Sequence, residues 1–168
     1  MKSVLISIHP KWCELIASGN KTIEVRKTRP KIETPFKCYT YETKARLDMP
    51  TFVDEDGHVL YTGRGQVIGE FVCDNVEVLF DTNGNPENYM TDILPSILQK
   101  TALSYDEFGA YVGSRADKNS IYGWHISDLK IYDKPKELCA FHHCGVNYHF
   151  NPAITRPPQS WCYVEELP

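Results

Sequence analysis

The sequence predicts an α+β fold in which a small, mostly β, barrel-like core carries a few short flanking helices. At least five segments have the β-branched and aromatic composition of strands, whereas helical periodicity is confined to short stretches. A strand, a helix and a second strand follow one another at the N-terminus, which excludes an all-β class. Because 168 residues can bury a substantial core, we expect one domain over residues 1–168, with an irregular insertion around 139–155.

The N-terminal elements are the most clearly marked. Residues 4–8 form an apolar run that is typical of a buried strand. Pro10 stands in the first turn of a helix, where proline is tolerated, and Gly19 suits the left-handed residue that closes a helix. In residues 21–27 apolar and polar side chains alternate, as they do in a strand with two different faces.

Composition and alternation predict further strands along the rest of the chain. They are expected at residues 36–41, in a hairpin over 50–62, at 66–73 with a continuation at 76–80, at 122–132 and at 160–165. In the long strand over 122–132 four apolar side chains are expected to point inward across a twist or bulge: Trp124, Ile126, Leu129 and Ile131.

Helical segments in the second half of the chain are short. Residues 91–103 are expected to be helical in pieces, because Pro95 interrupts them. Ser104 and Glu107 have the spacing of a capping box, which predicts a short helix that ends at Gly113. These helices are candidates to cover one end of the β core.

Composition and charge exclude several functional classes. The net charge is −4 and the pI is about 5.8, which argues against tight, sequence-independent binding to long nucleic acids. It leaves room for a single nucleotide or a flipped base in a local basic pocket. No apolar run reaches the roughly 20 residues that cross a bilayer, and the first residues have strand rather than signal-peptide character. We expect a cytoplasmic protein with no membrane partner, and the sequence leaves its oligomeric state open.

Three of the six cysteines lie inside apolar runs: Cys13, Cys38 and Cys73. In a reducing compartment such cysteines act as small buried hydrophobic residues. A second group, Cys139, His142, Cys144 and His149, has donors that could hold zinc. A matched second pair is lacking, because His143 and Cys144 are adjacent. We expect no cofactor; a structural zinc ion is the alternative to a loop with ordinary exposed histidines.

Lys21, Glu24 and Arg26 are the strongest candidates for a binding site. The alternation of residues 21–27 places Glu24 and Arg26 side by side on one face of a strand, with Lys21 at its entrance. One interpretation is a salt-bridge cluster that protects a sheet edge. The other is a ligand site, in which the two cations contact phosphate or carbonyl groups and Glu24 orients them or accepts from an exocyclic amine.

The residues 19–26, GNKTIEVR, match the G-x-K-x-x-E-x-R signature of ASCH domains, which are members of the PUA-like superfamily. The apolar strand and helix before them, and VIGE at residues 67–70, resemble the same family. YGWHI at 122–126 and RPPQSWCY at 156–163 resemble small phage and bacterial ASCH-like proteins. The resemblance implies a PUA-like mixed β-barrel, a cleft beside the first helix, and a role related to RNA or nucleotides.

One relative in this superfamily is an amidohydrolase acting on N4-acetylcytidine. The resemblance implies that Lys21 corresponds to its base and Glu70 to its proton donor. Glu24, however, stands where the relatives carry the Thr nucleophile, and a carboxylate cannot replace a hydroxyl that the lysine must deprotonate. Whether the chain is an enzyme therefore stays open.

The first functional hypothesis is a binding module for RNA, a nucleotide or a modified, unpaired base. Its ligand-binding residues are Lys21, Thr22, Glu24, Arg26, Trp12, Trp124, Ser160 and Trp161. Tyr122 and His125 are weaker candidates, and for the tryptophans a place in the core is the competing interpretation. The alternative is a small-substrate hydrolase, amidohydrolase-like or nuclease-like, that uses Lys21, Glu24 and Glu70. A third interpretation is a protein-interaction domain.

Overall fold

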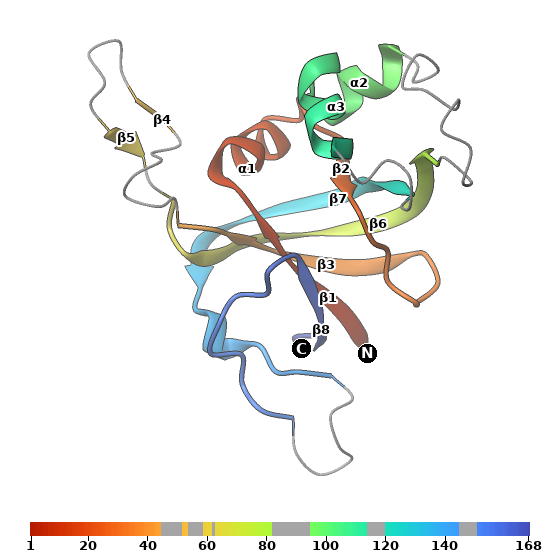
Figure 1. Ribbon diagram of the computed structural model, residues 1–168. Helices are drawn as coiled ribbons and strands as arrows, with labels where there is room; N and C mark the ends of the chain where they lie inside the picture. The colour runs from red at the N-terminus through yellow and green to blue at the C-terminus, as the bar shows by residue number, and fades with distance from the viewer. Residues whose placement is uncertain (45–51, 54–58, 62, 82–94, 114–119, 145–150) are drawn as a thin grey trace.

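A computed structural model describes residues 1–44, 52–53, 59–61, 63–81, 95–113, 120–144 and 151–168 (Figure 1). The first half contains β1 (Lys2–Ile8), α1 (Pro10–Ala17), β2 (Ile23–Arg26), β3 (Phe36–Glu42), β4 (Phe52–Val53), β5 (Val59–Tyr61) and β6 (Gln66–Phe80). The second half contains α2 (Pro95–Thr101), α3 (Tyr105–Val112), β7 (Ile121–Lys136), the 3₁₀ turn η3 (Leu138–Ala140) and β8 (Trp161–Glu165). The α+β class is confirmed.

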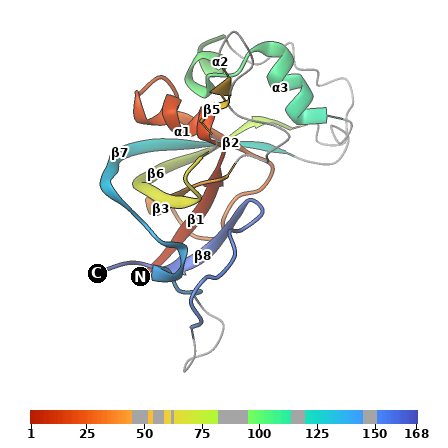
Figure 2. The same cartoon turned by 90° about the vertical axis from the view of Figure 1, so that its left-hand side faces the viewer.

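Six strands form one mixed sheet in the order β2-β7-β6-β3-β1-β8. Strands β1 and β3 are parallel, and the other neighbours are antiparallel. The three helices gather on one side of this sheet, while both chain ends lie on the other (Figures 1 and 2). Strands β4 and β5 pair only with each other within the described residues, as the predicted hairpin requires.

The predicted mixed β-barrel is confirmed only in part: the sheet is mixed, but it does not close into a barrel. Within the described residues, β2 and β8 end the strand order and do not pair with each other. Side chains cross the gap between these two edges. Arg26 on β2 donates to the hydroxyl of Ser160, just before β8, at 3.3 Å, and the Trp161 indole at the start of β8 donates to the Thr28 hydroxyl at 2.9 Å. These contacts bring the sheet edges together without backbone pairing.

Apolar side chains cover both sides of the sheet. One cluster places Ile6, Ile16 and Trp124 together, and contains all three cysteines that were expected to be buried. The other is built around Tyr39, Phe141 and other residues that pack under the segment between β7 and β8. Phe141 and Ile154 are the buried residues of the described parts of this segment, and η3 and isolated bridges at residues 142 and 143 connect it to its neighbours.

Local sequence signals account for most element boundaries. Gly19 follows α1 with φ +76°, a left-handed conformation that suits glycine. The Ser104–Glu107 capping box is present at the start of α3, and Gly113 is the residue that follows this helix. Pro95 is the first residue of α2 and does not interrupt it, and proline is tolerated at the start of a helix. Residues 91–94 lie outside the described residues. Strand β6 runs through the expected bend, with a shift in register between Cys73 and Val76.

Strand β7 contains the predicted irregularity. Asp128 has φ +45°, and the pairing with β6 shifts register nearby. Trp124 is fully buried, and Ile126 and Leu129 pack against the same core. The prediction that Ile131 points inward is wrong, because 43% of the surface of this residue is exposed. The bulge changes the alternation of the strand, so a fixed period of two cannot be carried through it.

The helices of the described residues are all short. None is both long and apolar enough to cross a membrane.

Candidate functional site

A cavity of about 990 Å³ opens between α1, β2, α3 and the residues that precede β8. Its lining includes Trp12, Glu24, Arg26, Tyr111 and Ser160. This volume is at the upper end of the range of roughly 300–1,000 Å³ that is usual for small-molecule sites. The strand–helix–strand unit thus places its charged residues beside a large cavity.

Lys21 lies on the floor of this cavity and is almost completely buried, with 3% of its surface exposed. Its Nζ donates a hydrogen bond of 2.7 Å to the carbonyl of Thr101, at the end of α2. Glu24 Oε2 lies 3.4 Å from the same nitrogen, and the ring centre of Trp12 lies 5.2 Å away. Burial lowers the pKa of Lys21 below its ordinary value, while the Glu24 carboxylate opposes this change.

Arg26 connects three parts of the fold. Its Nη2 donates to the Ser7 carbonyl at 2.6 Å and lies 2.9 Å from Glu24 Oε1. Its Nη1 donates to the Ser160 hydroxyl at 3.3 Å. The guanidinium therefore fixes the position of Glu24 and links the two edges of the open sheet. The predicted pairing of Glu24 and Arg26 on one face of β2 is confirmed.

The ion cluster of Lys21, Glu24 and Arg26 is incompletely satisfied. Arg26 Nε is buried and has no hydrogen-bond partner among the described residues, and the buried Glu24 Oε2 has Lys21 Nζ at 3.4 Å, which is long for a hydrogen bond. Leaving a buried donor unpaired costs free energy, about 1–3 kcal/mol. Both side chains belong to the cavity lining, so a ligand that donates to the carboxylate and accepts from the guanidinium would meet them there.

Aromatic residues provide apolar wall area. Trp12 comes from α1 and Tyr111 from α3, so the two rings reach the cavity from different helices. The Tyr111 hydroxyl donates to the Val25 carbonyl at 3.2 Å, which fixes the ring beside β2. Burial raises the pKa of this phenol, so it stays protonated at neutral pH.

Several predicted binding residues lie elsewhere. Trp124 is fully buried against Phe36 and does not line the cavity. Trp161 packs on Trp124, with ring centres 5.9 Å apart, and it is also outside the lining. Thr22 is exposed, and its backbone connects β2 to Lys100.

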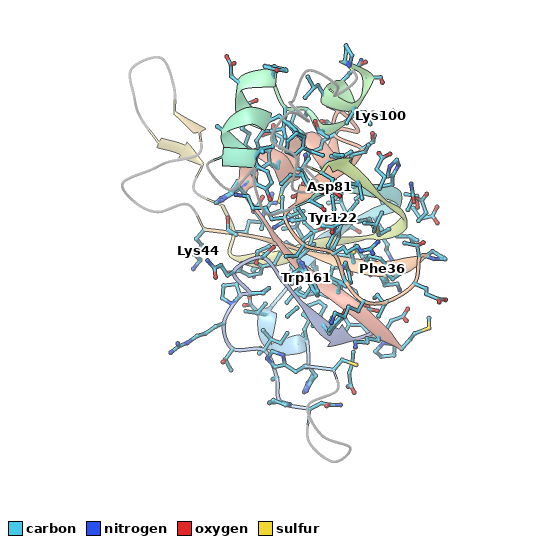
Figure 3. The ribbon with its side chains drawn as sticks, turned by 45° about the vertical axis from the view of Figure 1, so that its right-hand side comes forward. Phe36, Lys44, Asp81, Lys100, Tyr122 and Trp161 are labelled. Atoms are coloured by element: carbon cyan, nitrogen blue, oxygen red, sulfur yellow. The ribbon has the colours of Figure 1, made fainter. Side chains whose placement is uncertain are left out.

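The weaker candidates also have other contacts. The Arg29 guanidinium lies over the ring of Tyr122, 5.6 Å from its centre, and Tyr122 is labelled in Figure 3. His125 lies 2.7 Å from the Glu77 carboxylate. Neither residue is part of the cavity lining.

Glu70 belongs to a second network. It accepts a short hydrogen bond from the Tyr132 hydroxyl and lies 3.8 Å from Lys37 Nζ. Lys37 also pairs with Glu166 at 3.0 Å. Glu70 is not among the residues that line the cavity, so the fold does not bring it together with Lys21 there.

The cysteine and histidine cluster is only partly described. Cys139 is exposed, and His142 Nδ1 contacts the Asn151 carbonyl at 2.9 Å. His149 lies outside the described residues. Among those that are described, no group of three or more His, Cys, Asp and Glu side chains is placed to hold a metal ion.

Sequence reasoning missed the contribution of α2 and α3. The Thr101 carbonyl holds the Lys21 amine and the Tyr111 ring lines the cavity, although both residues lie about eighty residues from β2 in the chain. The capping box identifies α3 as a helix, but no local pattern indicates which part of the molecule the helix covers.

The profile of the ASCH domain matches residues 6–108 of this chain. No curated protein sequence matches this chain. Among solved structures, that of the ASCH protein from Zymomonas mobilis is similar with a TM-score of 0.58 and 18% identity, covering 98% of this chain and 88% of that one. A tyrosine-to-phenylalanine variant of that protein gives a TM-score of 0.60 and 18% identity, covering 99% of this chain and 92% of the variant. At this identity the likeness concerns the fold alone.

Proposed function

The chain belongs to the ASCH domain family of the PUA-like superfamily, and we propose that it binds a nucleotide or an unpaired base of RNA in the cavity beside Lys21, Glu24 and Arg26. The observation that carries this proposal is an acceptor beside a donor in the cavity lining, the Glu24 carboxylate and the Arg26 guanidinium, which are 2.9 Å apart. The Watson–Crick edge of a base presents a donor next to an acceptor, which is the complementary pattern. The volume of the cavity is sufficient for a nucleotide.

The walls support the same ligand class. A base is a flat aromatic ring, and stacking on an aromatic side chain contributes about 1–3 kcal/mol for each base. Trp12 and Tyr111 are the aromatic residues in the lining that come from the helices. A nucleotide placed between them and the ion cluster would use both its ring face and its polar edge.

Titration of the four nucleoside 5′-monophosphates and a short single-stranded RNA, followed by tryptophan fluorescence, tests this proposal. The Lys21→Met variant should weaken binding by about tenfold or more, because hydrogen bonds to charged groups contribute about 1.5–3 kcal/mol. It keeps the stem of the side chain and leaves Glu24 paired with Arg26 at 2.9 Å. Lys37→Met is the matched control, since it removes an amine from the second network.

Wild-type protein that binds none of these probes would contradict the proposal. So would equal weakening by Lys21→Met and Lys37→Met, because the effect would then not belong to the cavity. Thermal unfolding of each variant shows whether it is folded under the conditions of the titration.

One observation favours hydrolysis as a second candidate function. The lowered pKa of Lys21 increases the fraction of neutral amine, which is the form that can accept a proton. In an N4-acylated cytidine, this amine would take a proton from water as the hydroxide adds to the acyl carbon. The bond from the acyl carbon to N4 would then break, and N4 would leave with that proton, yielding cytidine and a carboxylic acid.

Incubation with N4-acetylcytidine distinguishes the two candidates. Release of cytidine by the wild type and its loss in Lys21→Met would support hydrolysis. Saturable binding without cytidine release would support the binding module alone. The contacts of Glu70 with Lys37 and Tyr132 give no support for its use as the proton donor of this site.

A further inference from the structure

Three exposed cations surround the cavity, and the proposed function does not use them: Lys27, Lys44 and Arg156, called the rim cations below. Lys27 and Lys44 belong to the lining, and Arg156 directly precedes Pro157 and Pro158, which also line it. None of the three forms an ion pair with another described residue. The rim therefore carries positive charge that no described residue neutralises.

The charge around the cavity differs from that of the whole chain. The chain has a net charge of −4, yet four lining residues are cationic and two are anionic. The two anionic residues are already paired: Glu24 with Arg26 and Lys21, and Glu107 with Lys11 at 3.0 Å. An anion that approaches the cavity thus meets a locally basic surface on an acidic protein.

The surroundings of the three rim cations differ. The Lys27 amine lies 4.9 Å from the ring centre of Tyr111, which is a cation–π distance. Lys44 passes so close to Gly65 that a Cβ there would lie 2.4 Å from its Cε, and Figure 3 shows Lys44 at the outer edge of the molecule. Arg156 leads into the two prolines, and the Pro158 carbonyl accepts from the Ser7 hydroxyl at 2.7 Å. A ring contact thus places the charge of Lys27, and the backbone two residues after Arg156 is anchored to β1.

We infer that the cavity receives its base from a single-stranded oligonucleotide whose flanking phosphates contact Lys27, Lys44 and Arg156. This inference rests on the proposed function, because the cavity holds the base while the rim holds the strand. A nucleoside monophosphate has one phosphate group for three separate cations, and the phosphates of a di- or triphosphate all extend from one side of the sugar, whereas a strand offers a phosphate on each side of the base. A single strand also presents its bases without the unpairing and unstacking that a duplex requires.

Counterion release gives a quantitative expectation. Each phosphate that is neutralised on a single strand contributes roughly −0.7 to the slope of log affinity against log salt concentration. Three phosphate contacts therefore predict a slope of about −2 for a short single-stranded RNA. An uncharged nucleoside should bind with little dependence on salt, because it has no phosphate to neutralise.

The test measures the affinity of a short single-stranded RNA of mixed sequence over a range of salt concentrations, with single-stranded DNA of the same sequence and uncharged nucleosides in parallel. The variant combines Lys27→Gln, Lys44→Gln and Arg156→Gln. The matched control combines Lys130→Gln, Lys134→Gln and Lys136→Gln, which removes the same charge from exposed residues of β7. The wild type and the control should have a slope of about −2, and the rim variant a slope near zero.

A rim variant that keeps the wild-type slope overturns the inference, as does a wild type that binds the oligonucleotide no more tightly than a nucleoside at low salt. If the rim variant does not fold, each single substitution should reduce the slope by about 0.7. A third outcome separates the two proposals: oligonucleotide binding depends on the rim, but nucleosides do not bind and Lys21→Met has no effect. This result would support the role of the rim cations and contradict the proposed base site. DNA that binds as tightly as RNA shows that the 2′-hydroxyl is not recognised.

Discussion

Two networks of lysine and glutamate side chains lie in different parts of this sheet, and the same residue types behave differently in them. In the cavity, Lys21 is 2% exposed at its side chain, and burial lowers its pKa. In the second network, the side chain of Lys37 is 30% exposed, and its hydrogen bond to Glu166 raises its pKa. Solvent access, and not the presence of a carboxylate partner, therefore decides the direction of the change.

The two networks also differ in what they connect and in what lies beside them. The second network connects β3 to β6 and to the chain end, through Lys37, Glu70 and Glu166. The cavity network places the Glu24 carboxylate and the Arg26 guanidinium in the lining of a cavity of about 990 Å³. Arg26 Nε is buried there without a hydrogen-bond partner among the described residues, but so are Thr40 Oγ1 and Trp124 Nε1 outside the lining. The cavity itself, and not the missing bond, therefore distinguishes this network.

Removing one carboxylate from each network should produce the largest contrast. Glu24→Gln leaves two buried cations without their counter-charge, and breaking a buried pair in this way costs about 3 kcal/mol or more. Glu70→Gln affects a partly exposed pair, for which the expected loss is below about 1 kcal/mol. The free energy of unfolding in urea measures both. Equal losses would show that burial does not distinguish the two networks.

Replacing one cation of each network by the other basic residue should give a smaller difference in the free energy of unfolding. Arg26→Lys keeps the charge but cannot reach the Ser7 carbonyl, the Ser160 hydroxyl and Glu24 at once. We expect a loss of about 2 kcal/mol in the free energy of unfolding, because at least one buried acceptor is left unpaired. Lys37→Arg should change stability by less than about 0.5 kcal/mol, as surface substitutions usually do. An Arg26→Lys variant as stable as the wild type would mean that Arg26 does not link the sheet edges.

The two lysines should make opposite contributions to the pH dependence of stability. Between the lowered pKa of Lys21 in the folded protein and its ordinary value of 10.5, the unfolded chain binds more protons. The contribution of Lys21 to stability therefore rises with pH across this window. The contribution of Lys37 is present below 10.5 and is lost as the pH rises through its raised folded-state pKa.

Urea unfolding of the wild type, Lys21→Met and Lys37→Met at a series of pH values from neutral to alkaline tests these signs. As the pH rises toward 10.5, the unfolding free energy of the wild type should increase relative to that of Lys21→Met. The difference between wild type and Lys37→Met should shift against the wild type at the alkaline end. Parallel curves for all three proteins would contradict the account of burial.

Ser160→Ala should have the smallest effect among the substitutions in the cavity network. The Ser160 hydroxyl accepts a 3.3 Å hydrogen bond from Arg26, which retains its other partners after the substitution. A loss of about 0.5–1 kcal/mol in the free energy of unfolding is expected, the usual contribution of one hydrogen bond. A much larger loss would indicate that the segment before β8, and not Arg26, holds the sheet edges together.

Local patterns in the sequence account for the parts of the fold and site that depend on neighbouring residues. The alternation in β2 placed Glu24 beside Arg26, and the glycine after α1 and the capping box of α3 marked helix ends. The run around Lys21 also identified the ASCH family.

What could not be predicted depends on distant contacts. The burial of Lys21 results from the Thr101 carbonyl eighty residues away, so the charged pattern alone indicated only a strand entrance. Whether the sheet closes is decided by side chains that cross a gap, not by strand composition. Trp124 and Trp161 could not be assigned to core or cavity, because their positions depend on how β7 and β8 meet. Glu70 lies in a strand at a plausible spacing but contacts the second network.

The most direct test of the central claim is a map of ligand-induced chemical-shift changes in the amide and indole spectrum. A short single-stranded RNA and the nucleoside 5′-monophosphates are added to the wild-type protein. Shifts should concentrate at Trp12, Lys21, Arg26, Tyr111 and Ser160, and should leave Lys37, Glu70 and Tyr132 unchanged. Shifts confined to the second network, or no shifts at saturating ligand concentrations, would contradict the assignment of the cavity as the binding site.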